Sequence, residues 1–127
     1  MLRPCALCGV LLALPAQADP APDYYVEALF AVSTAERLAQ VCAEGELDVE
    51  AAQGAAEEAL ARLDADGITG EMVTQLTGIE AGGGALQDAF MAQYGLESPS
   101  ESAICAAAQA EITAESAVGA VLQDVRP

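Results

Sequence analysis

The sequence predicts an all-α protein, a single up-down bundle of four helices that carries one disulfide bond. Apolar residues recur with a helical period in every segment of residues 19–127, and no run of alternating β-branched residues typical of strands occurs. Short turns separate the segments, which favours antiparallel neighbours. Cys42 ends the first predicted helix and Cys105 lies near the start of the fourth, so both fall at one end of such a bundle. A length of 127 residues suits one compact domain.

The first 18 residues are predicted to be a cleaved signal peptide rather than part of the fold. Arg3 precedes an apolar run from Ala6 to Leu14, and Ala16-Gln17-Ala18 places small residues where a signal peptidase inspects the chain. The apolar run is about half of the ~20 residues that span a bilayer, which argues against a membrane anchor. We therefore expect residues 19–127 to be the acidic helical domain of a periplasmic or secreted protein, with no membrane insertion after cleavage.

The first two helices follow from their apolar stripes and their caps. Asp23 is a plausible cap for the first helix, and Asp48 for the second. On the second helix, Glu58 and Arg62 are spaced as an exposed i,i+4 pair. The predicted inward residues are Tyr24, Ala28, Ala31, Val32, Ala35, Leu38, Ala39 and Cys42 on the first helix, and Val49, Ala52, Ala56, Ala59, Leu60 and Leu63 on the second.

The third stripe predicts one long helix. Gly67 supplies a left-handed stop for the second helix, and Thr69 is the expected cap of the next. The stripe keeps its phase through Gly82-Gly83-Gly84, which favours a continuous helix over two helices and a loop, although each glycine weakens it by roughly 1 kcal/mol. Gly83 is expected to let another backbone approach closely. The stripe comprises Met72, Leu76, Ile79, Gly83, Leu86, Phe90 and Tyr94.

The fourth helix is predicted to begin at Ser98-Pro99-Ser100-Glu101, a capping box with proline at the first helical position. Ile104, Cys105, Ala108 and Ile112 would point inward. Beyond Thr113 the stripe changes phase to Val118, Val121, Leu122 and Val125, which predicts a kink or a short break between Thr113 and Ser116.

Composition excludes several classes of function. The chain has 20 acidic residues, four arginines, and no lysine or histidine. There is thus no lysine for a Schiff base or P-loop and no imidazole base or histidine ligand. After residue 18 only three arginines remain against all 20 acids, a side-chain charge of −17. Such a surface repels phosphate backbones and anionic headgroups, so no nucleic-acid partner is expected; it suits solubility or a cationic partner.

The two cysteines after residue 18 predict one structural disulfide, Cys42–Cys105. Closing a loop of roughly 60 residues stabilises a fold by about 4 kcal/mol on the chain-entropy model. A redox-active pair is the alternative, but such pairs usually lie close together as C-x-x-C near a cation.

The sequence contains no complete motif for a metal site or a catalytic site. The loop Asp64 to Glu71 resembles a calcium loop, but its first and twelfth ligand positions would be Arg62 and Val73. Glu111 and Glu115 form an i,i+4 acidic pair that is expected to be a solvated edge. Tyr24, Tyr25 and Tyr94 are expected to pack at the core edge with hydroxyls in water. We therefore predict no catalytic residue, no cofactor and no metal site.

Several segments resemble a known family. They are Leu38-Ala39-Gln40-Val41-Cys42, Asp66-Gly67-Ile68-Thr69, Tyr94-Gly95-Leu96, and a tail with Cys105, Ala110-Glu111-Ile112, Ser116, Gly119 and Leu122. Together they resemble an uncharacterised family of small exported proteins of Gram-negative bacteria with a two-cysteine helical domain of unknown function. This chain departs from that pattern at 106–110, where alanines stand in place of glycine and basic residues. The resemblance implies a periplasmic location and no assigned activity.

Two classes of function remain. The first is a non-catalytic exported protein that acts through contacts with another protein, which an exposed apolar patch of a few hundred Å² would support. The alternative is a protein that binds a small molecule or a divalent cation, which a deep pocket with two or more buried carboxylates would support.

Overall fold

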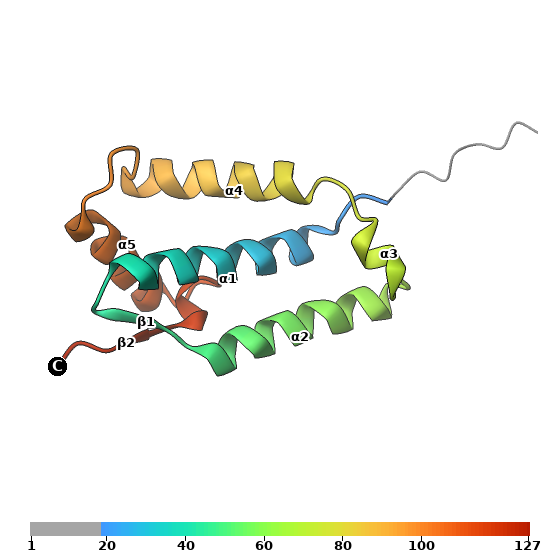
Figure 1. Cartoon of the computed structure of the whole chain (residues 1–127), viewed down its shortest axis with the longest axis horizontal. Helices are drawn as coiled ribbons and strands as arrows, with labels where there is room; N and C mark the ends of the chain where they lie inside the picture. The colour runs from blue at the N-terminus through green and yellow to red at the C-terminus, as the bar shows by residue number, and fades with distance from the viewer. Residues whose placement is uncertain (1–18) are drawn as a thin grey trace, which may run out of the picture.

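The computed structural model describes residues 19–127, so the predicted signal peptide lies outside the described residues. Figure 1 shows the long helices side by side, with another helix crossing near one end. The helices are α1 (Asp23–Val41), α2 (Val49–Ala65), α3 (Glu71–Thr74), α4 (Ile79–Tyr94) and α5 (Glu101–Ala114). A 3-10 turn, η1 (Gly119–Val121), and two strands, β1 (Gly45–Leu47) and β2 (Leu122–Asp124), complete the described chain.

The central element is α1, against which α2, α4 and α5 all pack. In Figure 1, α2 and α4 flank α1 on opposite sides, and they form no extended interface with each other. An up-down bundle would place each helix against two neighbours in a closed ring. The expected bundle is therefore replaced by an open layer of three helices, crossed by α5.

The inward face of α1 agrees with its stripe. Ala31, Ala35, Leu38 and Cys42 are buried, as is Val26, which the predicted stripe did not include. The N-cap is Pro22 rather than Asp23, which is already the first helical residue. Proline has no amide hydrogen to lose, so an extended Pro22 precedes the helix without cost.

The start of α2 agrees with the sequence, whereas its stripe is partly wrong. Asp48 is the N-cap, and its carboxylate accepts a hydrogen bond from the Ala51 amide at 3.0 Å. Ala52, Ala59 and Leu63 are buried, but Val49, Ala56 and Leu60 are exposed. Ala55 packs against the core instead. Since α2 contacts only α1 and η1 extensively, a narrower stripe than expected is enough to cover it.

The predicted long third helix is broken before its glycine run. It divides into α3 and α4, and the break ends at Gly78, whose φ is +80°. The reason is tertiary: the N-terminal segment pairs with the break, since the Thr77 amide donates to Asp19 O at 3.0 Å and the Ala21 amide donates to Thr77 O at 2.8 Å. The run Gly82–Gly84 itself stays helical within α4.

Two local expectations for this region are also wrong. The N-cap of α3 is Gly70 rather than Thr69. The close approach occurs at Gly82, where a Cβ would lie 3.1 Å from a methyl carbon of Val26, whereas a Cβ on Gly83 would meet nothing within 4 Å. The glycine stripe faces α1 one residue earlier than the sequence phase indicated.

The last helix begins later than predicted. Ser100, not Ser98, is the N-cap of α5 and accepts a hydrogen bond from the Ala103 amide at 3.1 Å. At the other end, Glu115 ends the helix with φ +52°. The predicted short break between Thr113 and Ser116 is therefore confirmed, and beyond it the chain continues into η1 and β2.

The two strands, which the sequence did not indicate, form a small antiparallel sheet. β1 pairs with β2 so that Leu47 lies opposite Leu122 and Glu46 opposite Gln123. Three residues a strand give too little alternation to read from sequence. The sheet holds the chain end beside the turn between α1 and α2.

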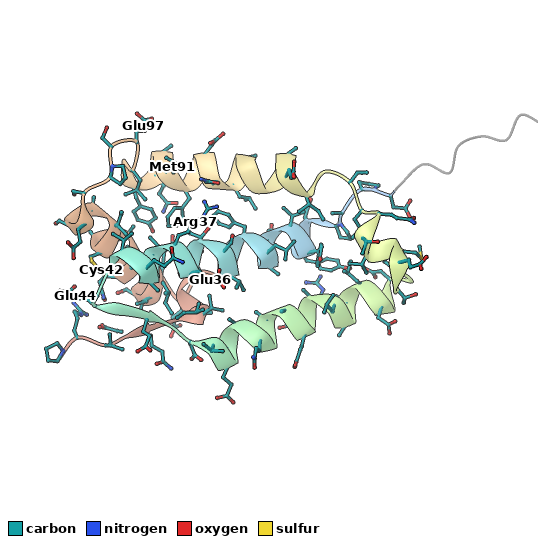
Figure 2. The ribbon with its side chains drawn as sticks, viewed as in Figure 1. Glu36, Arg37, Cys42, Glu44, Met91 and Glu97 are labelled. Atoms are coloured by element: carbon teal, nitrogen blue, oxygen red, sulfur yellow. A yellow bond between two sulfur atoms is a disulfide. The ribbon has the colours of Figure 1, made fainter. Side chains whose placement is uncertain are left out.

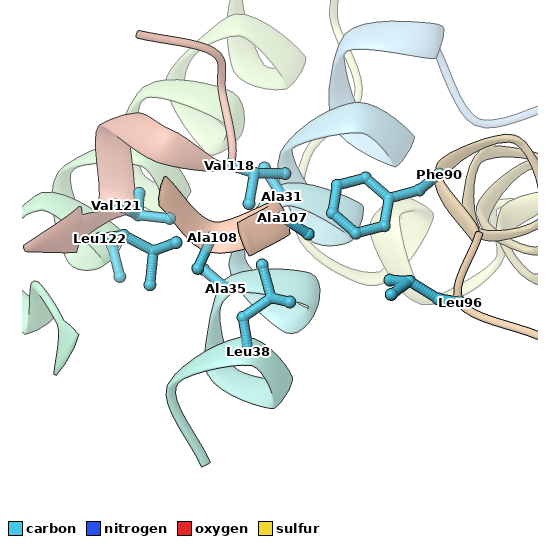
Figure 3. Close-up of a cluster of buried hydrophobic side chains, with 11 residues drawn as sticks. Ala31, Ala35, Leu38, Phe90, Leu96, Ala107, Ala108, Val118, Val121 and Leu122 are labelled. Carbon is cyan, nitrogen blue, oxygen red and sulfur yellow. The ribbon is translucent and has the colours of Figure 1, made fainter. Parts of the chain in front are cut away.

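The core is narrow and rich in alanine (Figure 3). Ala35, Ala107 and Ala108 have no exposed surface, and Val118, Val121 and Leu122 close the core from the C-terminal segment. Phe30 packs edge-to-face on Phe90, with 6.1 Å between ring centroids. Among the helices of residues 19–127, none combines the length and the apolar character needed to cross a membrane.

Candidate functional site

The disulfide bond ties the end of α1 to the first turns of α5. Cys42, the C-cap of α1, bonds to Cys105 with 5.1 Å between Cα atoms, which agrees with the expected pairing. Glu44 lies nearby (Figure 2), and these three side chains form the one cluster within residues 19–127 whose metal-ligand atoms converge within 4.8 Å. Because the two sulfur atoms are bonded to each other, neither is a thiolate ligand.

The buried charged side chain of the described region is Glu111, which is 7 % exposed. Its carboxylate accepts a hydrogen bond from the Tyr94 hydroxyl at 2.7 Å. Burial and this carboxylate raise the pKa of Tyr94 to about 12, because a phenolate there would be desolvated beside a negative charge. The expected solvated edge is therefore wrong for Glu111, although Glu115 is exposed.

The loop from Asp64 to Glu71 spans the end of α2, and one of its acids, Asp66, contacts α1. Gly67 has φ +82°, the left-handed conformation of a helix stop. Asp66 accepts a hydrogen bond from the Tyr24 hydroxyl at 2.6 Å. Arg62 lies 4.0 Å from the centre of the same ring, rather than in an ion pair with Glu58. Gly67 and Asp66 of the calcium-like loop therefore have structural roles in ending α2 and in contacting α1.

An open groove of about 580 Å³ lies between α1 and α2, next to η1. We call it the α1–α2 groove. Tyr24 and Arg62 stand at one end of it, and Glu27 and Glu58 also line it. Its remaining walls are small side chains, among them Ala28, Ala51, Gly54, Ala55, Ala117 and Ala120. Such walls allow another element to approach closely, since the side chains at a contact set the distance between helix axes.

A second groove, the α1–α4 groove, separates α1 from α4 on the other side of the layer, and it has two adjoining parts. The first part is an apolar slot of about 190 Å³ lined by Phe30, Leu38, Phe90, Met91, Leu96 and Ile104. The second part is wider, about 420 Å³, and Gly83 and Gly84 of α4 line it. Four residues line both parts: Phe30, Thr34, Arg37 and Gln87.

The arginines of the described chain have different surroundings. Arg126 forms an ion pair with Asp124 at 2.6 Å, and Arg62 lies over Tyr24. Arg37 forms neither an ion pair nor a side-chain hydrogen bond with any of residues 19–127, although it lies in the α1–α4 groove (Figure 2). It is therefore a cation at the junction of the two parts of this groove.

Sequence reasoning missed both grooves and the buried acid. The glycine run was the signal for the α1–α4 groove, since Gly83 and Gly84 meet nothing within 4 Å and leave space beside α1. No comparable signal marked Arg37 or Glu111, because their roles depend on which helices meet.

The comparisons place the chain in a family. A family model described as "Family of unknown function (DUF5333)" matches residues 20–123. The chain belongs to DUF5333. The matched span contains both cysteines and the helices of the described region, in agreement with the resemblance to a domain of unknown function. Neither curated proteins nor solved structures give a match. For this DUF5333 protein, function therefore has to be argued from the two grooves and the charges around them.

Proposed function

We propose that this DUF5333 protein is exported to the periplasm or secreted, and that it acts without catalysis by binding a helix of another protein. The observation that carries the proposal is the α1–α2 groove, an open channel with walls of alanine and glycine beside η1. A helix is the element that such a groove fits, because its side chains fill grooves of this kind at close range.

The position of the groove supports a helical occupant. In a closed bundle, α1 and α2 would be covered along their length by other helices. Here η1 contacts both helices, and the groove between them also reaches Tyr24 and Arg62. A partner helix in this place would complete a four-helix arrangement around α1.

The charge of the protein indicates the kind of helix. Residues 19–127 carry a side-chain charge of −17, and Glu27 and Glu58 line the groove itself. Arg62, the cation at the groove, already lies over the ring of Tyr24. Complementary charge favours association and selects against like-charged partners. The proposed partner is therefore a helix with small or apolar residues on one face and basic residues beside them.

Export and a non-catalytic role have separate support. The apolar run and the Ala16-Gln17-Ala18 site are typical of a secretory signal, and a disulfide is typical of an oxidising compartment. The absence of histidine and lysine from the sequence removes the commonest general base and amine nucleophile.

The α1–α2 groove is tested by a pair of adjacent substitutions. Gly54 lines the groove, and a Cβ there would meet nothing within 4 Å, so Gly54→Arg fills the groove without a clash in the fold. Gln53→Arg adds the same charge at an exposed neighbour outside the groove. The tagged wild type and Gln53→Arg should capture the same protein from periplasm, whereas Gly54→Arg should lose it.

The captured protein is then purified and its basic helix is titrated into each variant by calorimetry. A loss of at least tenfold in affinity confined to Gly54→Arg supports the groove. Equal binding by both variants, or binding that does not involve a helix of the partner, contradicts the proposal.

Export has its own measurement. The protein recovered from periplasm or medium should have an intact mass that corresponds to a chain starting at Asp19. Recovered material that retains residues 1–18, or protein found only in the cytoplasm, contradicts export.

A further inference from the structure

The α1–α4 groove has the two-part construction of a site for a small amphiphile. Its inner slot is lined by apolar side chains, including Phe90, Met91 and Ile104. Its volume of about 190 Å³ lies below the ~300 Å³ at which drug-sized pockets begin. The slot therefore suits a single short alkyl chain rather than a sterol or a two-chain lipid.

The mouth of the slot supplies the polar end. Arg37, Thr34 and Gln87 line both the slot and the wider part of the groove, so a group held there remains joined to a chain in the slot. A guanidinium binds a carboxylate through two parallel hydrogen bonds. Arg37 has no such partner among residues 19–127, although the sequence contains 20 acids.

The glycines of α4 keep the groove open next to this mouth. Added Cβ atoms on Gly83 and Gly84 would meet nothing within 4 Å, whereas Gly82 packs against Val26. Glycine within a helix is less stable than alanine, so two consecutive glycines weaken α4. Gly83 and Gly84 therefore leave open space in the part of the groove that Arg37 also lines.

We propose that the α1–α4 groove binds a medium-chain fatty acid, with the alkyl chain in the slot and the carboxylate on Arg37. The net charge of the protein does not prevent this, because salt screens distant charges over about 8 Å at physiological ionic strength. Glu80 lines the wider part but not the slot, whereas Arg37 lines both. This site is separate from the α1–α2 groove and holds a different class of ligand.

The probe is decanoate, added below its micelle concentration to the oxidised protein that starts at Asp19. Decyltrimethylammonium has the same chain and the opposite charge, and acetate has the same head without the chain. Decanoate should bind with one-to-one stoichiometry in calorimetry, and the other two at least tenfold more weakly. Equal binding of decanoate and decyltrimethylammonium, or no saturable binding of decanoate, overturns the proposal.

Two methionines report where decanoate binds. After residue 18 the sequence contains only Met72, on α3, and Met91, in the slot. With methionine methyl groups labelled with ¹³C, decanoate should shift the signal of Met91 and leave that of Met72 in place. Equal shifts of both signals indicate non-specific binding and overturn the proposal.

The role of Arg37 is tested against a matched arginine. Arg37→Gln should weaken decanoate binding by about tenfold or more, the usual effect of losing a charge-assisted hydrogen bond. Arg126→Gln, which follows β2 and lines neither part of the groove, should stay within twofold of the wild type. Equal effects of the two variants overturn the assignment.

The remaining outcomes identify another occupant. If decanoate does not bind but a peptide with an apolar C-terminal residue does, the groove holds the C-terminus of another protein. If the Met91 signal moves with protein concentration alone, the groove holds a second copy of this chain. Either result contradicts the fatty-acid site. Gly54→Arg should still bind decanoate, so the two proposals fail independently.

Discussion

The carboxylate of Glu111 is buried on folding, and the Tyr94 hydroxyl is its hydrogen-bond donor. The phenol donates to the carboxylate at 2.7 Å, and the ring lies 4.9 Å from that of Phe90. A buried carboxylate needs such a donor, because an unsatisfied one costs several times the net energy of a hydrogen bond. The Tyr94–Glu111 hydrogen bond therefore links α4 to α5.

The Tyr94–Glu111 pair predicts a loss of stability at high pH. The folded-state pKa of about 12 lies above the ordinary value of 10.0, so the stabilisation is complete below pH 10 and falls as the pH rises from 10 to 12. In Tyr94→Phe this dependence should shrink, and unfolding at pH 7 should become easier by about 1–3 kcal/mol. Urea unfolding followed by circular dichroism from pH 7 to 12 measures both effects.

Tyr25→Phe is the control, since the Tyr25 hydroxyl forms no hydrogen bond with the described residues. It should match the wild type within about 0.5 kcal/mol. The same pH profile in Tyr94→Phe and in the wild type would refute the assignment.

Gly119 is the glycine that the fold requires for space. A Cβ there would overlap the backbone of Glu111 and Ile112, because η1 lies directly on the end of α5. Gly119→Ala should destabilise the protein by about 1–3 kcal/mol or more. Gly54→Ala, in open space within α2, should instead stabilise it by about 0.5–1 kcal/mol. Thermal unfolding of the two variants tests this, and effects of the same sign would contradict it.

At the scale of elements, helix starts depend on which polar side chain meets the free amides. Ser98 and Ser100 are both plausible caps, and the structure uses Ser100. Ser100→Ala should destabilise the protein by about 1 kcal/mol, whereas Ser98→Ala should have almost no effect. Chemical denaturation of the two variants gives the comparison, and a larger loss in Ser98→Ala would mean that α5 begins earlier.

The break between α3 and α4 shows how a neighbour overrides a helical pattern. The apolar stripe continues from Met72 to Ile79. The helix is nevertheless interrupted before Ile79, because Thr77 pairs with the segment at Pro20. The local sequence does not indicate this pairing, because Pro20 and Thr77 are 57 residues apart in the chain. A four-residue α3 is the result.

At the scale of the whole molecule, the disulfide compensates for a core of small side chains. Alanine buries less apolar area than leucine, so each core position contributes less to stability. Cys42 and Cys105 close a separation of 63 residues, worth about 4 kcal/mol in a domain whose total stability is typically 5–15 kcal/mol.

Replacing both Cys42 and Cys105 by alanine should lower the melting temperature by on the order of 20 °C, with similar helical content in the folded protein. The wild type reduced by a phosphine should melt at nearly the same temperature as the double variant, which separates loss of the bond from loss of sulfur volume. A double variant that melts like the oxidised wild type would show that the bond is not structural.

The open layer also explains why the protein has grooves at all. With α2 and α4 on opposite sides of α1, each pair leaves a channel that a closed bundle would fill. Glu27, Glu58 and Arg62 line the α1–α2 groove, whereas Arg37 and Glu80 line the α1–α4 groove, so the charges are arranged differently in the two channels.

The sequence by itself determined the helical class, the start of α2 at Asp48, the inward face of α1 and the pairing of Cys42 with Cys105. These depend on local period, local caps and the count of cysteines, all of which are present in a short window of residues. Only the tertiary structure decided the break at Gly78, the small sheet, the burial of Glu111 and the open layer of helices. Each of these results from contacts between segments far apart in the chain, where a backbone group or a carboxylate finds its partner only after the helices have packed.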